Sequence, residues 1–162
     1  MEDSMKSLVI YDSYFGNTEK LAQTVGKALG TAKSVNVVRV ADVEPAQLEG
    51  LDLLIVASPT RGFRPSEGTT KFLNSLPANA LKGVKASVFD TRIDLETIKN
   101  KAFRFIVKRG GYANTAIAKM LEKKGAQVIQ PVEGFFVDDS EGPVSAGELE
   151  RAIEWAKKIA SS

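Results

Sequence analysis

Short apolar runs alternate with segments of helical periodicity along most of the chain. The runs are β-rich or nearly continuous in apolar residues, which is typical of strands in a parallel sheet covered on both faces. The runs predicted as strands are 6–11, 34–40, 51–57, 84–90 and 126–137, the last interrupted near Pro131. The segments with apolar residues three and four positions apart, predicted as helices, are 18–29, 66–76, 114–124 and 147–160. Residues 95–107 fit either a helix or an extended segment.

Strands that alternate with helices favour an α/β fold in three layers, with an open parallel sheet between two layers of helices. Right-handed crossover connections place the helices on both faces of the sheet. The chain has 162 residues, enough to bury a core, and we expect residues 1–162 to form a single domain. In such sheets a ligand binds beyond the carboxyl ends of the strands, where the strand order reverses.

The turn after the first predicted strand is the strongest candidate for a binding site. Residues 13–18 read Ser-Tyr-Phe-Gly-Asn-Thr and connect a buried strand directly to a helix. The free N–H groups and the dipole at the start of the helix attract an anion, most often a phosphate. Gly16 allows the backbone to come close, and Ser13, Asn17 and Thr18 can add side-chain donors. From this turn alone, a plain strand–helix connection is an equal alternative.

This turn resembles the phosphate loop of the flavodoxin family. The family pattern is a hydroxyl residue, any residue, a second hydroxyl residue, then Gly-x-Thr, with a small residue four positions later. Ser13, Gly16, Thr18 and Ala22 occupy matching positions. Phe15 replaces the second hydroxyl residue and removes one expected phosphate contact. The resemblance extends over almost the whole chain. It implies a flavodoxin-like sheet of five parallel strands in the order 2-1-3-4-5, and FMN as the bound cofactor.

The resemblance also implies a place for the flavin ring, between the loops that follow the third and fourth strands. The first of these loops, residues 58–64, also looks like the Pro-Thr-Arg loop of the WrbA-type NAD(P)H:quinone oxidoreductases. A backbone amide of this loop can face the ring nitrogens. Phe63 could stack on the ring, and the alternative is that Phe63 packs into the core. The cofactor-binding residues implied by the resemblance are Ser13, Tyr14, Phe15, Gly16, Asn17, Thr18, Pro59, Thr60, Arg61, Gly62, Phe63, Thr91, Arg92 and Asp94.

The second ring loop, residues 91–94, lacks the Tyr or Trp that often sandwiches the flavin ring in flavodoxins. Tyr112 could reach the same region, although a packing role is favoured. Arg61, Arg64 and Arg92 fall on the two ring loops. Positive charge there would favour the reduced cofactor, so we expect less negative reduction potentials than in acidic flavodoxins. The alternative is that these arginines point into solvent, where screening leaves little effect.

Composition excludes several functional classes. The chain has no cysteine and no histidine, which excludes disulfides, thiol catalysis and a Ser-His-Asp triad within it. Redox chemistry must therefore come from a bound organic cofactor. The net charge of +2 gives no reason to expect nucleic-acid binding. No apolar run is long enough to cross a membrane, and residues 1–6 lack a signal-peptide pattern, so we expect no membrane association and a cytoplasmic location.

The favoured function is electron transfer by bound FMN, with an electron carrier preferred over an enzyme. One alternative is an NAD(P)H-dependent FMN quinone reductase, suggested by the Pro-Thr-Arg loop. The other is a flavodoxin-fold interaction module that has lost tight FMN binding, suggested by Phe15 and the missing stacking aromatic. A response-regulator receiver is disfavoured because the third strand ends in Ala57-Ser58-Pro59, without a phosphoacceptor Asp. The sequence does not identify a redox partner protein and leaves a homodimer open.

Overall fold

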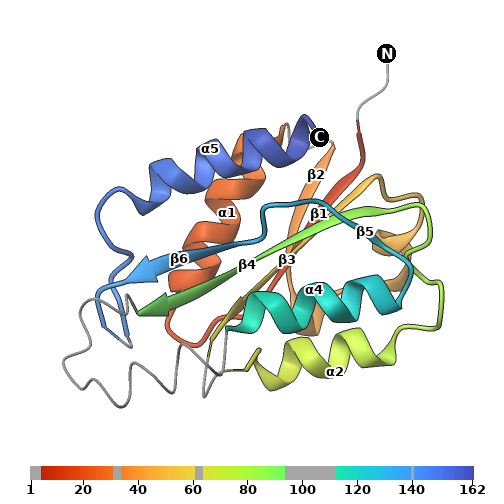
Figure 1. Ribbon diagram of the computed structural model, residues 1–162, viewed down its shortest axis with the longest axis horizontal. Coiled ribbons are helices and arrows are strands. Elements are labelled where there is room, and N and C mark those ends of the chain that lie inside the picture. Colours follow the sequence, from red (N-terminus) through yellow and green to blue (C-terminus); the bar gives the residue numbers. More distant parts are fainter. Residues whose placement is uncertain (1–4, 31–33, 61–63, 94–111, 140) are drawn as a thin grey trace.

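The computed structural model describes residues 5–30, 34–60, 64–93, 112–139 and 141–162. Its centre is a twisted parallel sheet, seen nearly edge-on in Figure 1. The strands are β1 (Ser7–Tyr11), β2 (Val35–Arg39), β3 (Leu53–Pro59), β4 (Lys85–Ile93), β5 (Gln127–Val128) and β6 (Glu133–Val137). Their order is β2-β1-β3-β4-β5, and β6 also pairs with β4. The predicted α/β fold and the order 2-1-3-4-5 are confirmed.

The helices form one layer on each face of the sheet. They are α1 (Asn17–Leu29), α2 (Glu67–Ser75), α4 (Ala113–Lys123) and α5 (Glu148–Ala160), and two short 3₁₀ turns occupy Val40–Asp42 and Pro45–Leu48. Helices α1 and α5 cover one face, and α2 and α4 cover the other (Figure 1). Each layer of helices packs against the sheet around a separate apolar core, which includes Leu21 and Trp155 on the first face and Leu73 and Ile117 on the second.

The predicted fifth strand forms as two short strands that follow one another along β4. β5 pairs with Lys85 and Ala86, and β6 pairs with the stretch from Phe89 to Ile93. Pro131 lies between them and has no N–H to donate to a ladder. Its carbonyl oxygen accepts a hydrogen bond of 2.7 Å from Trp155 Nε1. Within the described residues the sheet therefore has six strands, where five were expected.

The ends of β3 and β4 also differ from the prediction. Residues 91–94 were expected to form a loop, but Thr91, Arg92 and Ile93 belong to β4 because β6 continues the ladder alongside them. Likewise, Ser58 and Pro59 are the last residues of β3 and pair with β4. The first residues of both predicted loops therefore belong to strands, and the pairing of those strands fixes their positions.

The register of the strands brings their carboxyl ends to one edge of the sheet. Tyr11 of β1 lies beside Ala57 of β3, which lies beside Phe89 of β4. The residues that follow these three therefore lie close together at that edge of the sheet.

Across the described ranges, none of the helices combines the length and the apolar character needed to cross a membrane.

Candidate functional site

A cavity of about 230 Å³ opens at the carboxyl ends of β1, β3, β4 and β6. It lies next to the start of α1 and is walled by residues from four separate parts of the chain. The residues that line it are Ser13, Tyr14, Phe15, Asn17, Thr18, Pro59, Thr60, Thr91, Arg92, Ile93 and Val137. This is the place at which an open α/β sheet binds ligands, because the strand order reverses between β1 and β3.

The turn from β1 to α1 is held by its own hydrogen bonds. The Ser13 N–H donates to Asp12 Oδ1 at 2.9 Å, and the Gly16 N–H donates to Ser13 Oγ at 3.0 Å. Gly16 precedes the helix with φ of 91°, a left-handed conformation that favours glycine. Helix α1 begins at Asn17, so the first N–H groups of the helix have no acceptor within it and face outward from its end.

A side chain of β2 makes a second set of contacts with this turn. Arg39 Nη1 donates to the Ser13 carbonyl oxygen at 3.2 Å, and Arg39 Nη2 lies 3.7 Å from Glu19 Oε2. Tyr11 Oη donates to the same Glu19 oxygen at 2.6 Å. Burial raises the pKa of Tyr11, and the Glu19 carboxylate raises it further. Residues from β1, β2 and α1 thus fix the backbone of the turn.

Threonine hydroxyls link the turn to β4 across the cavity. Thr18 Oγ1 lies 2.9 Å from Thr91 Oγ1, and both side chains are buried. Either hydroxyl can be the donor in this pair, so Thr18 can accept from Thr91 and still donate to a phosphate, as expected from the sequence. Tyr14 and Phe15 lie on the outside of the turn, each with 50% of its surface exposed.

Gly142, which follows β6, comes close to the same turn. A Cβ on Gly142 would collide with the side-chain amide of Asn17. Val144 bridges back to Val137, which lines the cavity. Asn17 is therefore packed between the cavity and the residues that follow β6.

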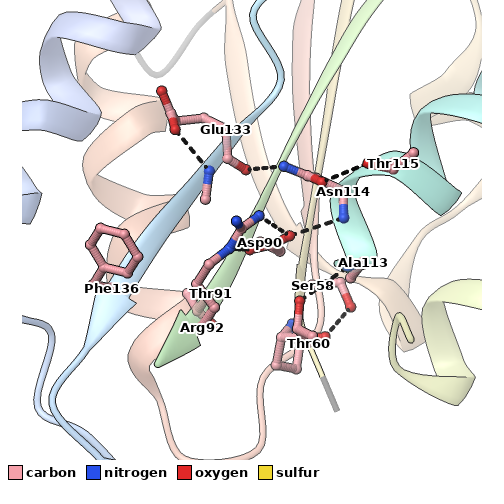
Figure 2. A network of polar contacts seen from close by, with 12 residues as sticks. Ser58, Thr60, Asp90, Thr91, Arg92, Ala113, Asn114, Thr115, Glu133 and Phe136 are labelled. Atoms are coloured by element: carbon pink, nitrogen blue, oxygen red, sulfur yellow. Dashed lines mark hydrogen bonds and ion pairs between the residues drawn. The ribbon is translucent and has the colours of Figure 1, made fainter. Parts of the chain in front are cut away.

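The opposite side of the cavity is built on a buried ion pair (Figure 2). Asp90 is fully buried, and its two oxygens accept from Arg92 Nε at 2.6 Å and Arg92 Nη2 at 2.7 Å. The N–H of Asn114, in the first turn of α4, also donates to Asp90, at 3.0 Å. Burial raises the pKa of the Asp90 carboxyl, while Arg92, Asn114 and the Thr60 hydroxyl act in the opposite direction.

Neighbouring residues extend this network to three elements. The Ala113 N–H donates to Thr60 Oγ1 at 3.1 Å, and Asn114 Nδ2 donates to the Glu133 carbonyl oxygen at 3.0 Å. Figure 2 shows Thr60, Asn114 and Glu133 around the Asp90–Arg92 pair. Asp90 accepts from Arg92 of β4 and from Asn114 of α4, while Thr60 accepts from Ala113, so these contacts connect the ends of β3 and β4 with the start of α4.

The structure brings together most of the predicted site residues. Nine of them line the cavity: Ser13, Tyr14, Phe15, Asn17, Thr18, Pro59, Thr60, Thr91 and Arg92. Gly16 supports the turn without lining the cavity. Arg61, Gly62, Phe63 and Asp94 lie outside the described residues. Ile93 and Val137 also line the cavity and were not predicted, because an apolar strand residue gives no sign in sequence that it faces a site.

The structure bears on the expected effect of Arg64 and Arg92 on the reduction potentials of the cofactor. Arg92 is neither a free cation nor exposed to solvent, because Asp90 compensates its charge and only 15% of its side chain is exposed. Its Cζ lies 3.5 Å from the ring centroid of Tyr112, so Tyr112 packs against a residue that lines the cavity. Arg64 is exposed and does not line the cavity.

The residues of the cavity suit a nucleotide with a flavin ring. One end offers hydroxyl and amide groups and the start of a helix, which suit a phosphate. The other end offers strand backbone and apolar side chains, which suit a flat ring.

Comparisons with known proteins point the same way. The flavodoxin family model matches residues 9–148. The flavodoxin of Maridesulfovibrio salexigens is 37% identical over 89 residues, and the match covers 52% of this chain and 61% of that protein, which is less than two thirds of its length.

Several solved structures share the fold. A flavodoxin from the domain Archaea superposes with a TM-score of 0.74 at 20% identity, covering 97% of each chain. Flavodoxin 1 of Bacillus cereus has a TM-score of 0.70 at 19% identity, with 96% and 97% of the two chains covered. A WrbA-like flavodoxin from Agrobacterium tumefaciens has a TM-score of 0.72 at 16% identity, with 98% and 96% covered. Because the family model matches most of this chain, from residue 9 to residue 148, the chain belongs to the flavodoxin family, whose members bind FMN.

Proposed function

We propose that this protein binds FMN in the cavity at the carboxyl ends of the strands and acts as an electron carrier. The observation that supports this best is the cavity itself, which joins the turn before α1 to the ends of β3 and β4. When bound, FMN supplies the redox chemistry that the side chains of this chain lack. The chain contributes binding, orientation and exclusion of water.

In this proposal the phosphate binds at the turn of residues 13–18. The N–H groups at the start of α1 point outward from the helix, and the helix dipole favours an anion there. Ser13, Asn17 and Thr18 line the same end of the cavity. The turn is fixed in advance by Asp12, Gly16 and Arg39, so little conformational freedom is lost on binding.

The flavin ring then lies between the ends of β3 and β4. Pro59, Thr60, Arg92 and Ile93 line that part of the cavity. The two ring loops start from paired strands and from the Asp90 network, so the walls of this site are rigid. Phe63 and Asp94, which the resemblance assigns to the ring site, remain part of this proposal.

A titration with FMN and with riboflavin tests the proposal. Both ligands carry the flavin ring, and only FMN carries the phosphate. We expect the purified protein to quench FMN fluorescence saturably and to bind riboflavin much more weakly. Thr18→Ala should weaken binding of FMN, while Thr24→Ala, which removes a hydroxyl on the same helix away from the cavity, should not. Equal FMN affinity in both variants would contradict the placement of the phosphate.

The same preparation separates the alternatives. Oxidation of NAD(P)H with a quinone acceptor would favour the reductase suggested by the Pro-Thr-Arg loop. A protein that stays colourless and unresponsive to FMN would favour the interaction module. A cytoplasmic location and transfer of electrons to a partner protein belong to the proposal, and a homodimer is checked by the mass in solution.

A further inference from the structure

We propose that Asp90 is a positioning residue for the ring end of the cofactor site, acting through Arg92. It holds the guanidinium against β6 and cancels its charge, so the ring meets a compensated ion pair instead of a free cation. This inference rests on the proposed function. It concerns a buried carboxylate that does not itself line the cavity.

The geometry of the pair leaves Arg92 little freedom. Two parallel hydrogen bonds, of 2.6 and 2.7 Å, join its Nε and Nη2 to the two oxygens of Asp90. This fork geometry fixes the plane of the guanidinium as well as its distance. Asp90 is itself anchored by the N–H of Asn114 at 3.0 Å.

Two further residues lie against the guanidinium. The ring of Tyr112 lies against it, with 3.5 Å between the Arg92 Cζ and the ring centroid. Gly134 of β6 lies close to Arg92 Nε, Cζ and Nη2, and a Cβ at that position would overlap all three atoms. The absence of a side chain at Gly134 therefore makes room for Arg92.

This arrangement determines the net charge that the Asp90–Arg92 pair presents to the cavity. Arg92 lines the cavity, and its positive charge would act strongly on a flavin in a site of low dielectric. Because Asp90 is in direct contact with Arg92 and fully buried, the pair presents almost no net charge to the cavity. Removing the negative charge alone would expose the ring to an uncompensated cation, which favours the reduced and more negative cofactor.

Reduction potentials of bound FMN test this directly. We expect Asp90→Asn, which keeps the size of the side chain, to shift the potential to a less negative value. The double variant Asp90→Asn with Arg92→Gln has the same net charge as the original pair, and its potential should return towards the original. Asp52→Asn makes the same charge change at the amino end of β3, away from the cavity, and should leave the potential unchanged. An unchanged potential in Asp90→Asn, or the same shift in the double variant, would overturn the proposal.

Gly134→Ala provides a second test in case Asp90→Asn does not fold. It keeps both charges and displaces the guanidinium through the added methyl group. FMN and riboflavin should both bind about tenfold more weakly, a loss of about 1.4 kcal/mol for each, because the change lies at the ring end. Unchanged binding of both ligands, or a loss confined to FMN, would overturn the proposal. If the original protein binds no FMN at all, the proposed function itself fails, which is a distinct result.

Discussion

Arg39 Nη1 lies 3.2 Å from the carbonyl oxygen of Ser13, so a side chain from the edge strand β2 holds the backbone of the turn that we assign to the phosphate. The same guanidinium approaches Glu19 in the first turn of α1. It therefore joins the two sides of the turn without lining the cavity.

This contact predicts a selective loss of affinity. Arg39→Gln should weaken FMN binding by about three- to tenfold, the equivalent of one net hydrogen bond, because the turn is no longer held in its binding conformation. Riboflavin binding should not change, since riboflavin has no phosphate. Lys27→Gln, in the last turn of α1, is the matched loss of positive charge and should affect neither ligand. An equal loss for both ligands would show that Arg39 acts on the fold as a whole.

Gly16 and Gly147 form a natural pair for a second prediction. Each precedes a helix with positive φ, 91° and 85°, and neither has an atom within 4 Å of an added Cβ. Alanine at either position should therefore cost a similar free energy of unfolding, about 1–2 kcal/mol, from backbone strain alone. Urea unfolding measures this cost. Only Gly16→Ala should also lower the affinity for FMN, and a similar loss in Gly147→Ala would contradict the assignment of the turn.

The start of α2 predicts a cost in stability with no change in cofactor binding. Ser66 Oγ accepts from the N–H of Thr69 at 3.2 Å and caps the helix. Ser66→Ala should lower the free energy of unfolding by about 1 kcal/mol. Ser75→Ala, at the other end of the same helix, removes an exposed hydroxyl and should cost less. Similar unfolding midpoints for the two variants would contradict the capping role.

Glu148 predicts a dependence of stability on pH. Burial raises the pKa of its carboxyl, but hydrogen bonds from Arg151 and the Phe136 N–H outweigh burial, and the pKa lies below its ordinary value. A carboxyl with a lowered folded pKa stabilises the fold above its unfolded pKa and loses that contribution as the pH falls through the folded pKa.

Glu148→Gln should therefore lower the free energy of unfolding by about 1–2 kcal/mol at neutral pH, and the difference from the original protein should shrink in acid. Urea unfolding at a series of pH values measures this. Glu150→Gln, on the exposed side of the same helix turn, should give a small difference that hardly changes with pH. A difference for Glu148→Gln that stays constant down to low pH would contradict the role of its charge.

The order of the strands could be predicted because the apolar runs and the helical segments alternate regularly. The turn around Gly16 was also visible, since its glycine and hydroxyl residues stand directly between a buried strand and a helix. The extension of β4 through Arg92 was not visible, because it depends on pairing with β6, more than forty positions away in sequence. The packing around Arg92 was hidden for a similar reason, because Tyr112 and Gly134 lie against its guanidinium and no local pattern links these residues. Its pairing with Asp90, two positions earlier, depends on both residues belonging to β4, and the sequence indicated a loop from residue 91.

The central claim is that the turn of residues 13–18 binds the phosphate of a flavin nucleotide. The most direct measurement is a parallel fluorescence titration of the purified protein with FMN and with riboflavin, which differ in that phosphate. The account predicts saturable quenching of FMN fluorescence by the protein, with riboflavin bound more weakly by at least about tenfold, a difference of about 1.4 kcal/mol. Equal affinity for the two ligands, or no quenching of either, would contradict it.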